Sequence, residues 1–444
     1  MIRIIRESER DLLDEMLKRL EARAVAFDPE LMKTVSTIID DVRARGDEAL
    51  IDYAARFDGI ELKLADLRID EHTLNAAADK VDTRVLAALR EAINNVRAFH
   101  EHQLEKSWEF TAADGVRLGQ RIEPLECVGL YVPGGTAAYP SSVVMNVVPA
   151  QVAGVERIVV TTPPRTLFEC PAVAAALREL NITEIYAVGG AQAIAALAFG
   201  TQTIPRVDKI TGPGNKYVAA AKKLVFGVVG IDAIAGPSEV VIIADDTARA
   251  DFVAADLLAQ AEHGEDAAAI LMTTSYELAR EVDQEVQRQI RLLPRRAIAE
   301  ASLKNYGALV VLNTMKEVCA ITNWIAPEHL QLVTKDDEAI ASQIRHAGAI
   351  FLGGHTPEAA GDYLAGPNHV LPTGRTARFS SALGVYDFVK RTSVLCYSSE
   401  AFSKVAHSIT VLAECEGLAA HARSASIRSK TGFPQRRKDS KKGS

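Results

Sequence analysis

The sequence predicts an α/β protein built on two parallel sheets, and two features of the chain indicate it. From Cys127 to about Gly214, short apolar strands alternate with helical stretches, as in CVGLYV, RIVVTTPP, EIYAVGG and KITGPG. A second alternating set follows in EVVIIADD, AAILMTTS, ALVVLN, HLQLVT and AIFLGG. Alternation of this kind implies parallel strands joined by crossover helices. We therefore expect two sheets in one chain.

The two ends of the chain have helical patterns. LMKTVSTIIDDVRARGDEALIDYAARFDG carries apolar side chains every three or four positions, broken by Gly46 and closed by Gly59. After about Gly384, AFSKVAHSITVLAECEGLAAHARSASI predicts a helical C-terminal appendage. The last residues, RSKTGFPQRRKDSKKGS, are basic and lack apolar periodicity, which is typical of a disordered tail. A tether to nucleic acid or a membrane surface is the alternative.

Composition excludes several classes of protein. The 444 residues are 48% hydrophobic and 24% charged, as in soluble globular proteins of two or three domains. No apolar run has membrane-spanning length, and MIRIIRESERDLLDEM is charged too early for a signal peptide, so we expect a cytoplasmic protein. The net charge of -8 argues against nucleic-acid binding. Five scattered cysteines without CxxC spacing favour neither disulfides nor a thiolate zinc site.

The stretch DFVAADLLAQAEHG predicts one helix, with Asp251 as a candidate cap and Gly264 as a stop. Gln260 and His263 stand three positions apart near its end, so they share a face and can reach toward one point, as two metal ligands would. Zinc prefers Cys, His, Asp and Glu, however, and an amide oxygen is a weak donor. A polar last turn that faces water is the simpler interpretation of this pair alone.

Glycine-rich turns follow several predicted strands. In open α/β sheets, ligands bind beyond the carboxyl ends of the strands, where LYVPGGTAAYP, AVGGAQAI and KITGPGNKYV lie; AGPSEV leads into another strand. Such turns admit a ligand closely, and the helix N-termini after them suit phosphate. A dinucleotide is one interpretation and tight turns are the other. The G-x-G-x-x-G fingerprint is absent, because Tyr217 stands where the third glycine belongs.

Two acid and histidine pairs are candidates for chemistry. Glu328 and His329 are neighbours immediately before a strand in IAPEHLQL. Histidine is readily poised as a base near neutral pH, and a nearby carboxylate could handle a second proton. Glu416 and His421 lie on the C-terminal helix in ECEGLAAHARS. A surface loop is the alternative for Glu328 and His329. A lone histidine on a helix is usually structural or solvent-facing, and nothing near His421 in the sequence indicates otherwise.

A third pair falls in TPEAAGDYLAGPNHVLP, which we expect to be a glycine-punctuated loop after a strand. Its Asp362 and His369 could join Gln260 and His263 around one metal ion. The alternative is a rigid turn with a capping aspartate.

Taken in order, these blocks resemble the histidinol dehydrogenase family, the zinc enzymes that complete histidine biosynthesis. The resemblance runs from roughly Asp28 to His421. Its most specific elements are VGLYVPGG, VGGAQAIAALAFGT, KITGPGN, AGPSEV, LLAQAEHG, PEHL, AGDYLAGPNHVLPT and GLAAHA. So many matches in one order are improbable by coincidence.

The resemblance implies roles for individual residues. The acid-base pair would be Glu328 and His329. One Zn²⁺ per subunit would be held by Gln260, His263, Asp362 and His421. The substrate would contact these four ligands and His329, together with Ser238, His369 and Glu416. The NAD contacts would be Tyr131, Gln192 and Asn215.

The resemblance also implies the organisation of the chain. The family has two incomplete Rossmann-like domains with helical N- and C-terminal arms that interlock in a homodimer, so the missing fingerprint is expected. His421 would come from the neighbouring subunit. We accordingly expect an N-terminal arm at residues 1–25 and a discontinuous first domain formed by residues 26–128 and 238–383. The second domain, on the cofactor side, comprises residues 129–237. A helical dimerisation arm at 384–427 and a basic tail at 428–444 complete the chain.

The implied reaction is a four-electron oxidation of L-histidinol to L-histidine by two NAD in succession. His329 would take the alcohol proton, Glu328 would activate water against an enzyme-held aldehyde, and zinc would position the substrate. Glu416 would bind the substrate's ammonium group, which favours histidinol over other primary alcohols. The competing hypotheses are a related dehydrogenase, a zinc hydrolase without a nicotinamide requirement, and a non-catalytic dimeric binding module.

Overall fold

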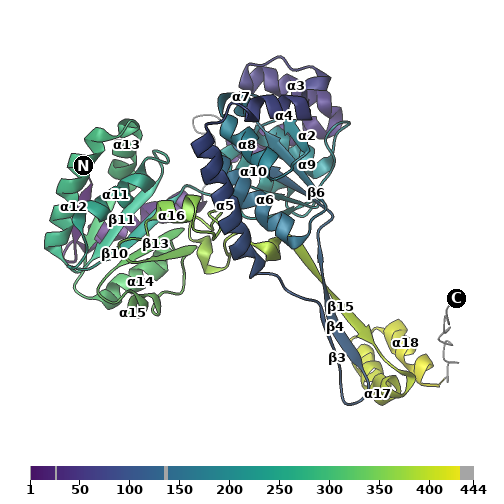
Figure 1. Ribbon diagram of the computed structural model, residues 1–444. Coiled ribbons are helices and arrows are strands. Elements are labelled where there is room, and N and C mark those ends of the chain that lie inside the picture. The colour runs from purple at the N-terminus through teal and green to yellow at the C-terminus, as the bar shows by residue number, and fades with distance from the viewer. Residues whose placement is uncertain (1, 26–27, 135–138, 431–444) are drawn as a thin grey trace. The chain divides into compact units, whose positions relative to one another are not determined.

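Two six-stranded sheets and one three-stranded sheet form the framework of the computed structural model, which describes residues 2–25, 28–134 and 139–430 (Figure 1). The chain divides into a larger unit, Met1–Leu104 with Leu125–Phe388, and a smaller unit, Glu105–Pro124 with Val389–Ser444. Both six-stranded sheets belong to the larger unit, and every strand pair in them is parallel except one at an edge. The α/β prediction with parallel sheets is confirmed.

The first sheet is entirely parallel. Its strand order is β1 (Arg3–Arg6), β12 (Ala308–Val311), β11 (Ala268–Thr273), β10 (Glu239–Ala244), β13 (His329–Val333) and β14 (Ala349–Leu352). The helices associated with it are α1 (Arg10–Val25), α11 (Ala250–Ala261), α12 (Tyr276–Gln289), α13 (Arg296–Tyr306), α14 (Met315–Ile325), α15 (Asp337–Ala341) and α16 (Glu358–Tyr363).

Strand β10 shows why this sheet is covered on both faces. Val240 and Ile242 enter one hydrophobic cluster with α11 and α12, whereas Val241 and Ile243 enter another with α1 and α14. Successive side chains of a strand point to opposite faces. A strand buried on both faces is therefore an unbroken apolar run, as EVVIIA nearly is.

The second sheet has the order β2 (Arg68–Ile69), β7 (Glu184–Ala187), β6 (Arg157–Thr162), β5 (Cys127–Tyr131), β8 (Lys209–Thr211) and β9 (Gly230–Ile231). Only β2 runs antiparallel to its neighbour. Its helices are α2 (Pro29–Arg45), α3 (Asp47–Tyr53), α4 (Glu71–Ala78), α5 (Thr83–Glu101), α6 (Pro140–Ala153), α7 (Thr166–Glu169), α8 (Pro171–Glu179), α9 (Gly190–Phe199) and α10 (Lys216–Val225).

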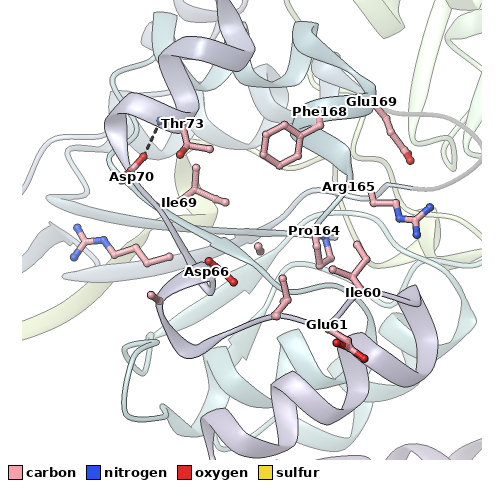
Figure 2. A pocket seen from close by; sticks show the side chains of 14 residues that line it. Ile60, Glu61, Asp66, Ile69, Asp70, Thr73, Pro164, Arg165, Phe168 and Glu169 are labelled. Atoms are coloured by element: carbon pink, nitrogen blue, oxygen red, sulfur yellow. Dashed lines mark hydrogen bonds between the residues drawn. The ribbon is translucent and has the colours of Figure 1, made fainter.

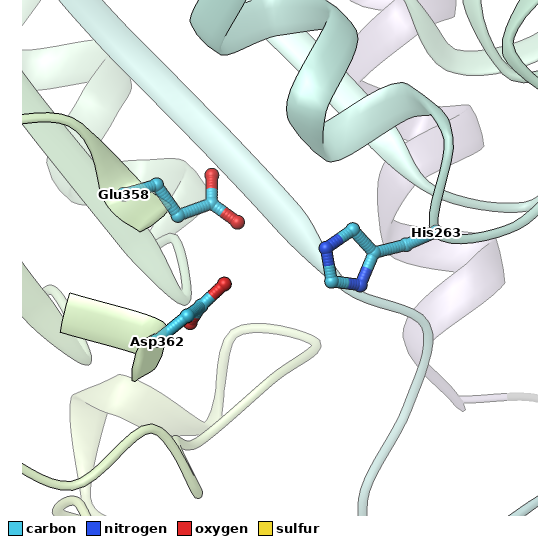
Figure 3. Close-up of side chains that lie close together, drawn as sticks. All are labelled: His263, Glu358 and Asp362. Carbon is cyan, nitrogen blue, oxygen red and sulfur yellow. The ribbon is translucent and has the colours of Figure 1, made fainter. Parts of the chain in front are cut away.

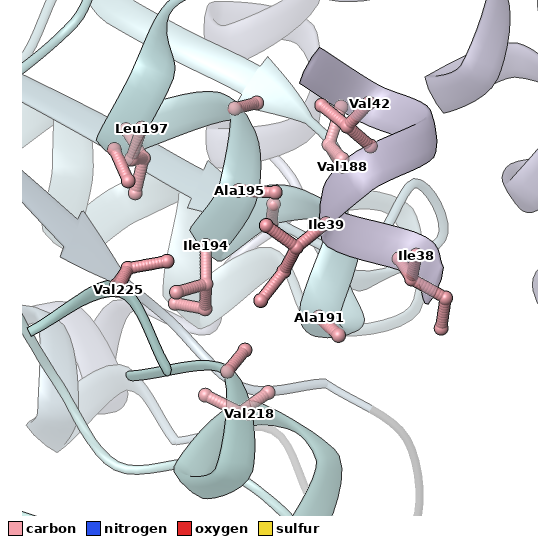
Figure 4. Close-up of a cluster of buried hydrophobic side chains, with 14 of the residues drawn as sticks. Ile38, Ile39, Val42, Val188, Ala191, Ile194, Ala195, Leu197, Val218 and Val225 are labelled. Carbon is pink, nitrogen blue, oxygen red and sulfur yellow. The ribbon is translucent and has the colours of Figure 1, made fainter. Parts of the chain in front are cut away.

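The N-terminal segments are attached to other sheets than the predicted domain boundaries imply. Residues 26–128 were expected to join the first sheet, but Ile39 and Val42 of α2 pack with Ile194 of α9 in the core of the second sheet (Figure 4). The described part of the segment expected to be an N-terminal arm, residues 2–25, supplies an edge strand and a covering helix to the first sheet. Amphipathic spacing marks the buried face of a helix but not its partner, so these attachments were not visible in the pattern.

The smaller unit combines an antiparallel sheet with a helix pair. Strand β4 (Arg117–Pro124) lies between β15 (Val389–Cys396) and β3 (Trp108–Thr111), and α17 (Ser399–Cys415) packs against α18 (Ala419–Lys430). The quoted stretch AFSKVAHSITVLAECEGLAAHARSASI is helical as predicted, but the residues between Gly384 and it form a short 3-10 helix, Val385–Asp387, and strand β15. Large apolar side chains are exposed here, including Trp108, Leu395 and Leu412. The predicted tail lies mostly outside the described residues. None of the described helices has the length and hydropathy of a membrane span.

Candidate active site

Glu328 and His329 lie side by side at the start of β13. Helix α14 ends at Ile325, its C-cap residue Ala326 has a left-handed backbone (φ 49°), and the chain then enters the strand at His329. Both side chains are buried, and the Nδ1 atom of His329 lies 3.7 Å from the nearer carboxylate oxygen of Glu328. A histidine and a carboxylate are thus fixed together in a site from which water is largely excluded.

One residue of the neighbouring strand contacts both members of this pair. The backbone N–H of Glu239 donates a hydrogen bond to Oε2 of Glu328 at 3.0 Å. The backbone carbonyl of Glu239 lies 3.3 Å from Nδ1 of His329. A carbonyl only accepts, so this contact places the neutral ring's proton on Nδ1. Nε2 has no hydrogen-bond partner among the described residues and carries the lone pair of a base.

His263, Glu358 and Asp362 form a group with the geometry of a metal site. One potential ligand atom from each lies within 4.8 Å of the others. Figure 3 shows the imidazole of His263, from the turn after α11, facing two carboxylates from α16. Asp362 connects this group to the acid-base pair, because its Oδ1 lies 3.8 Å from Nε2 of His329. Imidazole and carboxylate are ligands that suit Zn²⁺.

Gln260 is fully buried beside this group. With its amide nitrogen directed at Glu358, it donates to both carboxylate oxygens, at 3.0 and 3.3 Å. This orientation is chosen because the opposite one sets the amide oxygen against the carboxylate. Glu358 therefore holds the nitrogen of Gln260 and leaves the amide oxygen for another partner.

Glu358 is not among the site residues predicted from the sequence. We expected TPEAAGDYLAGPNHVLP to be a loop, but its first part forms α16, in which Glu358 and Asp362 are four residues apart and share a face. The E-x-x-x-D spacing after Pro357 was the available signal. The helix prediction at 251–263 was also too long. Helix α11 ends at Ala261, so His263 lies in the following turn, and Arg249 rather than Asp251 is its N-cap residue.

Burial shifts the protonation equilibria of the cluster. Burial raises the pKa of Glu328 to about 8, with contributions from the carboxylates of Glu239 and Asp362. It also raises the pKa of Asp362 to about 6 and that of Glu358 well above its ordinary value. Burial lowers the pKa of His329 to about 3. A cation among these groups favours the charged carboxylates, which is the arrangement expected of a metal site.

The remaining substrate candidates of the larger unit lie in the same region. Ser238 immediately precedes β10, and its side chain hydrogen-bonds Glu328. Nδ1 of His369 lies 3.0 Å from the backbone carbonyl of Asp362. Strands β10 and β13 begin here, so the group sits at the amino ends of the first sheet. The expectation that sites follow the carboxyl ends of strands does not hold for Ser238, His263 and Glu328, which lie in segments that lead into β10, β11 and β13. Asp362 and His369, by contrast, follow β14.

The predicted cofactor residues do follow the carboxyl ends of the second sheet. Tyr131 is the last residue of β5, and its buried hydroxyl accepts a hydrogen bond from Gly190 N–H at 3.1 Å. Gln192 is buried in the first turn of α9. Asn215 caps α10, where its side chain accepts from two backbone N–H groups, of Tyr217 at 3.0 Å and Val218 at 3.2 Å.

The glycine-rich turns near these residues are packed so closely that a side chain would not fit. A Cβ on Gly134 would stand 2.1 Å from the hydroxyl of Thr166, and one on Gly189 would stand 2.7 Å from the ring of Pro163. Three buried hydroxyls at this edge of the sheet have no hydrogen-bond partner among the described residues: Thr161, Thr162 and Thr166. Unpaired buried hydroxyls beside close-packed glycines suit a polar ligand.

A pocket of about 600 Å³ opens nearby (Figure 2). Pro164 and Arg165, which follow β6, and Ala187 at the end of β7 form one side of it, and residues of the segment 60–73 form the other. None of the predicted site residues in the described ranges lines this pocket.

Glu416 and His421 belong to the smaller unit. Glu416 is the C-cap residue of α17, and His421 lies in the first turn of α18; both side chains are exposed. Their roles in the site stay predictions.

Comparisons with known proteins agree with one another. A family model described as histidinol dehydrogenase matches residues 21–429. Histidinol dehydrogenase of Geobacillus kaustophilus (strain HTA426) is 55% identical over 404 residues, which cover 91% of this chain and 95% of that protein. The enzyme of Neisseria gonorrhoeae (strain ATCC 700825 / FA 1090) is 52% identical over 415 residues, covering 93% and 97%.

A solved structure is similar over nearly its whole length. The crystal structure of histidinol dehydrogenase from Elizabethkingia anophelis has a TM-score of 0.89 and 37% sequence identity, and the match covers 96% of this chain and 98% of that chain. The buried Glu328 and His329 beside a metal-type cluster are consistent with these matches. The chain therefore belongs to the histidinol dehydrogenase family and is an oxidoreductase.

Proposed function

We propose that the protein oxidises L-histidinol to L-histidine in two NAD-dependent steps at a site that holds one Zn²⁺ per subunit. The observation that carries this proposal is the position of His329, whose Nε2 has no hydrogen-bond partner among the residues that the structure describes and lies 3.8 Å from Oδ1 of Asp362 in the metal-type group. The similar proteins are named histidinol dehydrogenases, which supports histidinol as the substrate. Membership of an oxidoreductase family sets aside the zinc hydrolase and the non-catalytic binding module.

The donors in this chain fit zinc. We assign His263 and Asp362 as ligands, with the amide oxygen of Gln260 as a third, since Glu358 holds its nitrogen. His421 of the neighbouring subunit is the proposed fourth. The exposed apolar side chains of the smaller unit, such as Leu395 (66% exposed), support a homodimer because such surface is usually covered by a partner.

The second sheet fits NAD. Tyr131, Gln192 and Asn215 are the proposed contacts, and the hydroxyls of Thr161, Thr162 and Thr166, which have no hydrogen-bond partner within the described part of the chain, are donors available to a phosphate or ribose. When bound, zinc holds and orients the substrate's nitrogens, and NAD accepts hydride from its alcohol carbon.

The chain's own residues move the protons. His329 is neutral at physiological pH, so its Nε2 accepts the alcohol proton as the carbinol carbon is oxidised to the aldehyde. Glu328, in its carboxylate form, takes a proton from the water that adds to the aldehyde. The hydrated aldehyde then gives its hydroxyl proton to His329 in the second oxidation. Burial of both residues limits water access, which keeps the aldehyde from side reactions.

The remaining contacts select the substrate. We assign Ser238 and His369 to substrate binding in the larger unit, beside Glu328 and Asp362 respectively. Glu416 is the proposed partner of the substrate ammonium, since a carboxylate forms a charge-assisted hydrogen bond with it. A primary alcohol without an amino group gains nothing from Glu416.

The direct test is whether the purified, zinc-loaded protein catalyses the reduction of NAD by L-histidinol. Histidinol-dependent NADH formation, absent with an isosteric alcohol that lacks the amino group, is the expected result. Zinc-loaded protein that forms no NADH from histidinol would overturn the proposal.

A further inference from the structure

A buried ion pair lies directly behind the acid-base pair. The guanidinium of Arg23, near the end of α1, contacts the carboxylate of Glu239, at the start of β10, with 2.6 Å between Nη2 and Oε2. Each side chain is only 5% exposed. The two residues are 216 positions apart in sequence, so the first helix of the chain reaches the first residue of the central strand.

Both ends of this ion pair are fixed by further contacts. Nη1 of Arg23 donates to the carbonyl of Asp266 at 2.5 Å and to that of Ser238 at 3.4 Å. The guanidinium also lies over the ring of Tyr306, 5.3 Å from its centroid. The second carboxylate oxygen of Glu239 accepts from the N–H of Gly374 at 3.1 Å. The side chain of Glu239 is therefore held at both oxygens.

The backbone of Glu239 carries the functional contacts. Its N–H holds the carboxylate of Glu328, and its carbonyl faces Nδ1 of His329. These two contacts orient the proposed water-activating carboxylate and set the tautomer that leaves Nε2 of His329 free. A change in the direction of the Glu239 peptide groups would therefore alter both the orientation of Glu328 and the tautomer of His329.

We propose that Arg23 and Glu239 are positioning residues, whose ion pair fixes the peptide groups that orient Glu328 and His329. This inference rests on the proposed function, because it concerns the same acid-base pair.

A purely structural role explains the pair less well. Burying two charges removes their hydration, and a buried ion pair is often no more stabilising than apolar side chains of similar volume. Burial raises the pKa of Glu239 even beside Arg23, which shows how poorly the position solvates charge. The ion pair loses its hydration on burial and contacts both Ser238 and the acid-base pair. Such a pair is expected where the orientation of catalytic side chains, here Glu328 and His329, depends on it.

The test separates geometry from stability. The variants Arg23→Met, Glu239→Gln and the double variant Arg23→Met/Glu239→Gln are compared as zinc-loaded protein with Arg23→Lys, which retains the charge. The matched control is Lys209→Met, which removes a partly buried ion pair with Asp387, 3.0 Å apart, on the second sheet. For each protein, kcat, both KM values, the pH profile, zinc content and Tm are measured.

We expect kcat to fall about 10- to 100-fold in the single and double variants, since small misplacements of reacting groups have effects of this order. KM for histidinol and zinc content stay near those of the wild type, and the pH profile of kcat shifts because Glu328 loses its donor. Arg23→Lys recovers part of kcat. Lys209→Met lowers Tm but leaves kcat unchanged.

A double variant with lowered Tm but wild-type kcat and pH profile would overturn the proposal and leave the pair a structural role. If the Met variants do not fold, Arg23→Lys and Glu239→Gln carry the same comparison. Wild-type protein is assayed first. Its failure to oxidise histidinol refutes the proposed function, whereas an active wild type with unaffected variants refutes only the positioning role.

Discussion

Nε2 of His329 lies 3.8 Å from Oδ1 of Asp362, so the atom that we assign as the base faces the group that we assign to the metal. Asp362 comes from a helix and His329 from a strand start, and the two are brought together only by the fold. A substrate oxygen held near Asp362 is within direct reach of the base.

Replacing His329 by asparagine tests the base. His329→Asn is expected to lower kcat by about 10² to 10⁴, the range typical of general acid-base catalysis. Zinc content and histidinol binding should remain, since His329 is not among the proposed ligands. Metal analysis and calorimetric titration with histidinol check both points. Loss of zinc in this variant would instead make His329 part of the metal site.

Glu328→Gln separates the two oxidations. The amide cannot take a proton from water, so the first oxidation is expected to continue while conversion of the aldehyde slows. Rapid-mixing experiments should then show an early NADH phase without the second. Equal slowing of both phases would contradict the division of roles between Glu328 and His329.

The metal-free protein should lose stability as the pH rises from 6.5 to 8. The pKa of Glu328 is raised to about 8 by burial, so the folded protein keeps a proton there that the unfolded chain has released. His329 and His369, with pKa values lowered to about 3 and 4, are neutral in the folded state. In the unfolded chain the same histidines have an ordinary pKa of about 6.5, so they too become neutral as the pH rises above that value. The unfolded state therefore binds fewer protons in this window, and stability falls with pH.

Urea unfolding of chelator-treated protein at several pH values measures this slope. Glu328→Gln should flatten it, and zinc should reduce it because a cation favours the charged carboxylates. Stability that rises across this window would contradict the assignment of Glu328 as a buried, protonated acid.

Glu358 is expected to support metal binding. Glu358→Gln removes the carboxylate that holds the amide nitrogen of Gln260, and loss of such a supporting contact typically weakens metal affinity about 10- to 100-fold. Competition with a chromophoric chelator measures the affinity. Glu265→Gln, an exposed acid in the turn after α11, is the control and should bind zinc as the wild type does.

Shared sites predict complementation between inactive subunits. His421→Ala and His263→Ala homodimers should each be inactive, whereas mixed and reassembled dimers should regain activity at the one site that has both histidines. Differently tagged subunits allow the heterodimer to be isolated. A purified heterodimer without activity would place His421 in its own subunit's site.

The sequence predicted the sheets well because their strands are apolar runs that differ from the helices between them. The attachment of α2 to the second sheet and of β1 to the first was not predicted. The apolar pattern of a helix or strand shows which side chains are buried but not which element they pack against. Spacing singled out Gln260 and His263, and loop position singled out Asp362, but only the ordered motifs favoured a metal site over the simpler interpretations, because residues far apart in sequence carry little local signal of a shared ligand. Glu358 was missed because its helix was taken for a loop, and Arg23 because a single arginine on a helix resembles a solvated one.

The number of NADH molecules formed per L-histidinol consumed, measured before and after chelation and zinc restoration, tests both the four-electron oxidation and the role of the metal. We expect two NADH per histidinol, with activity lost on chelation and restored by zinc. One NADH per histidinol with release of an aldehyde, or two NADH from protein shown to be free of metal, would contradict this expectation.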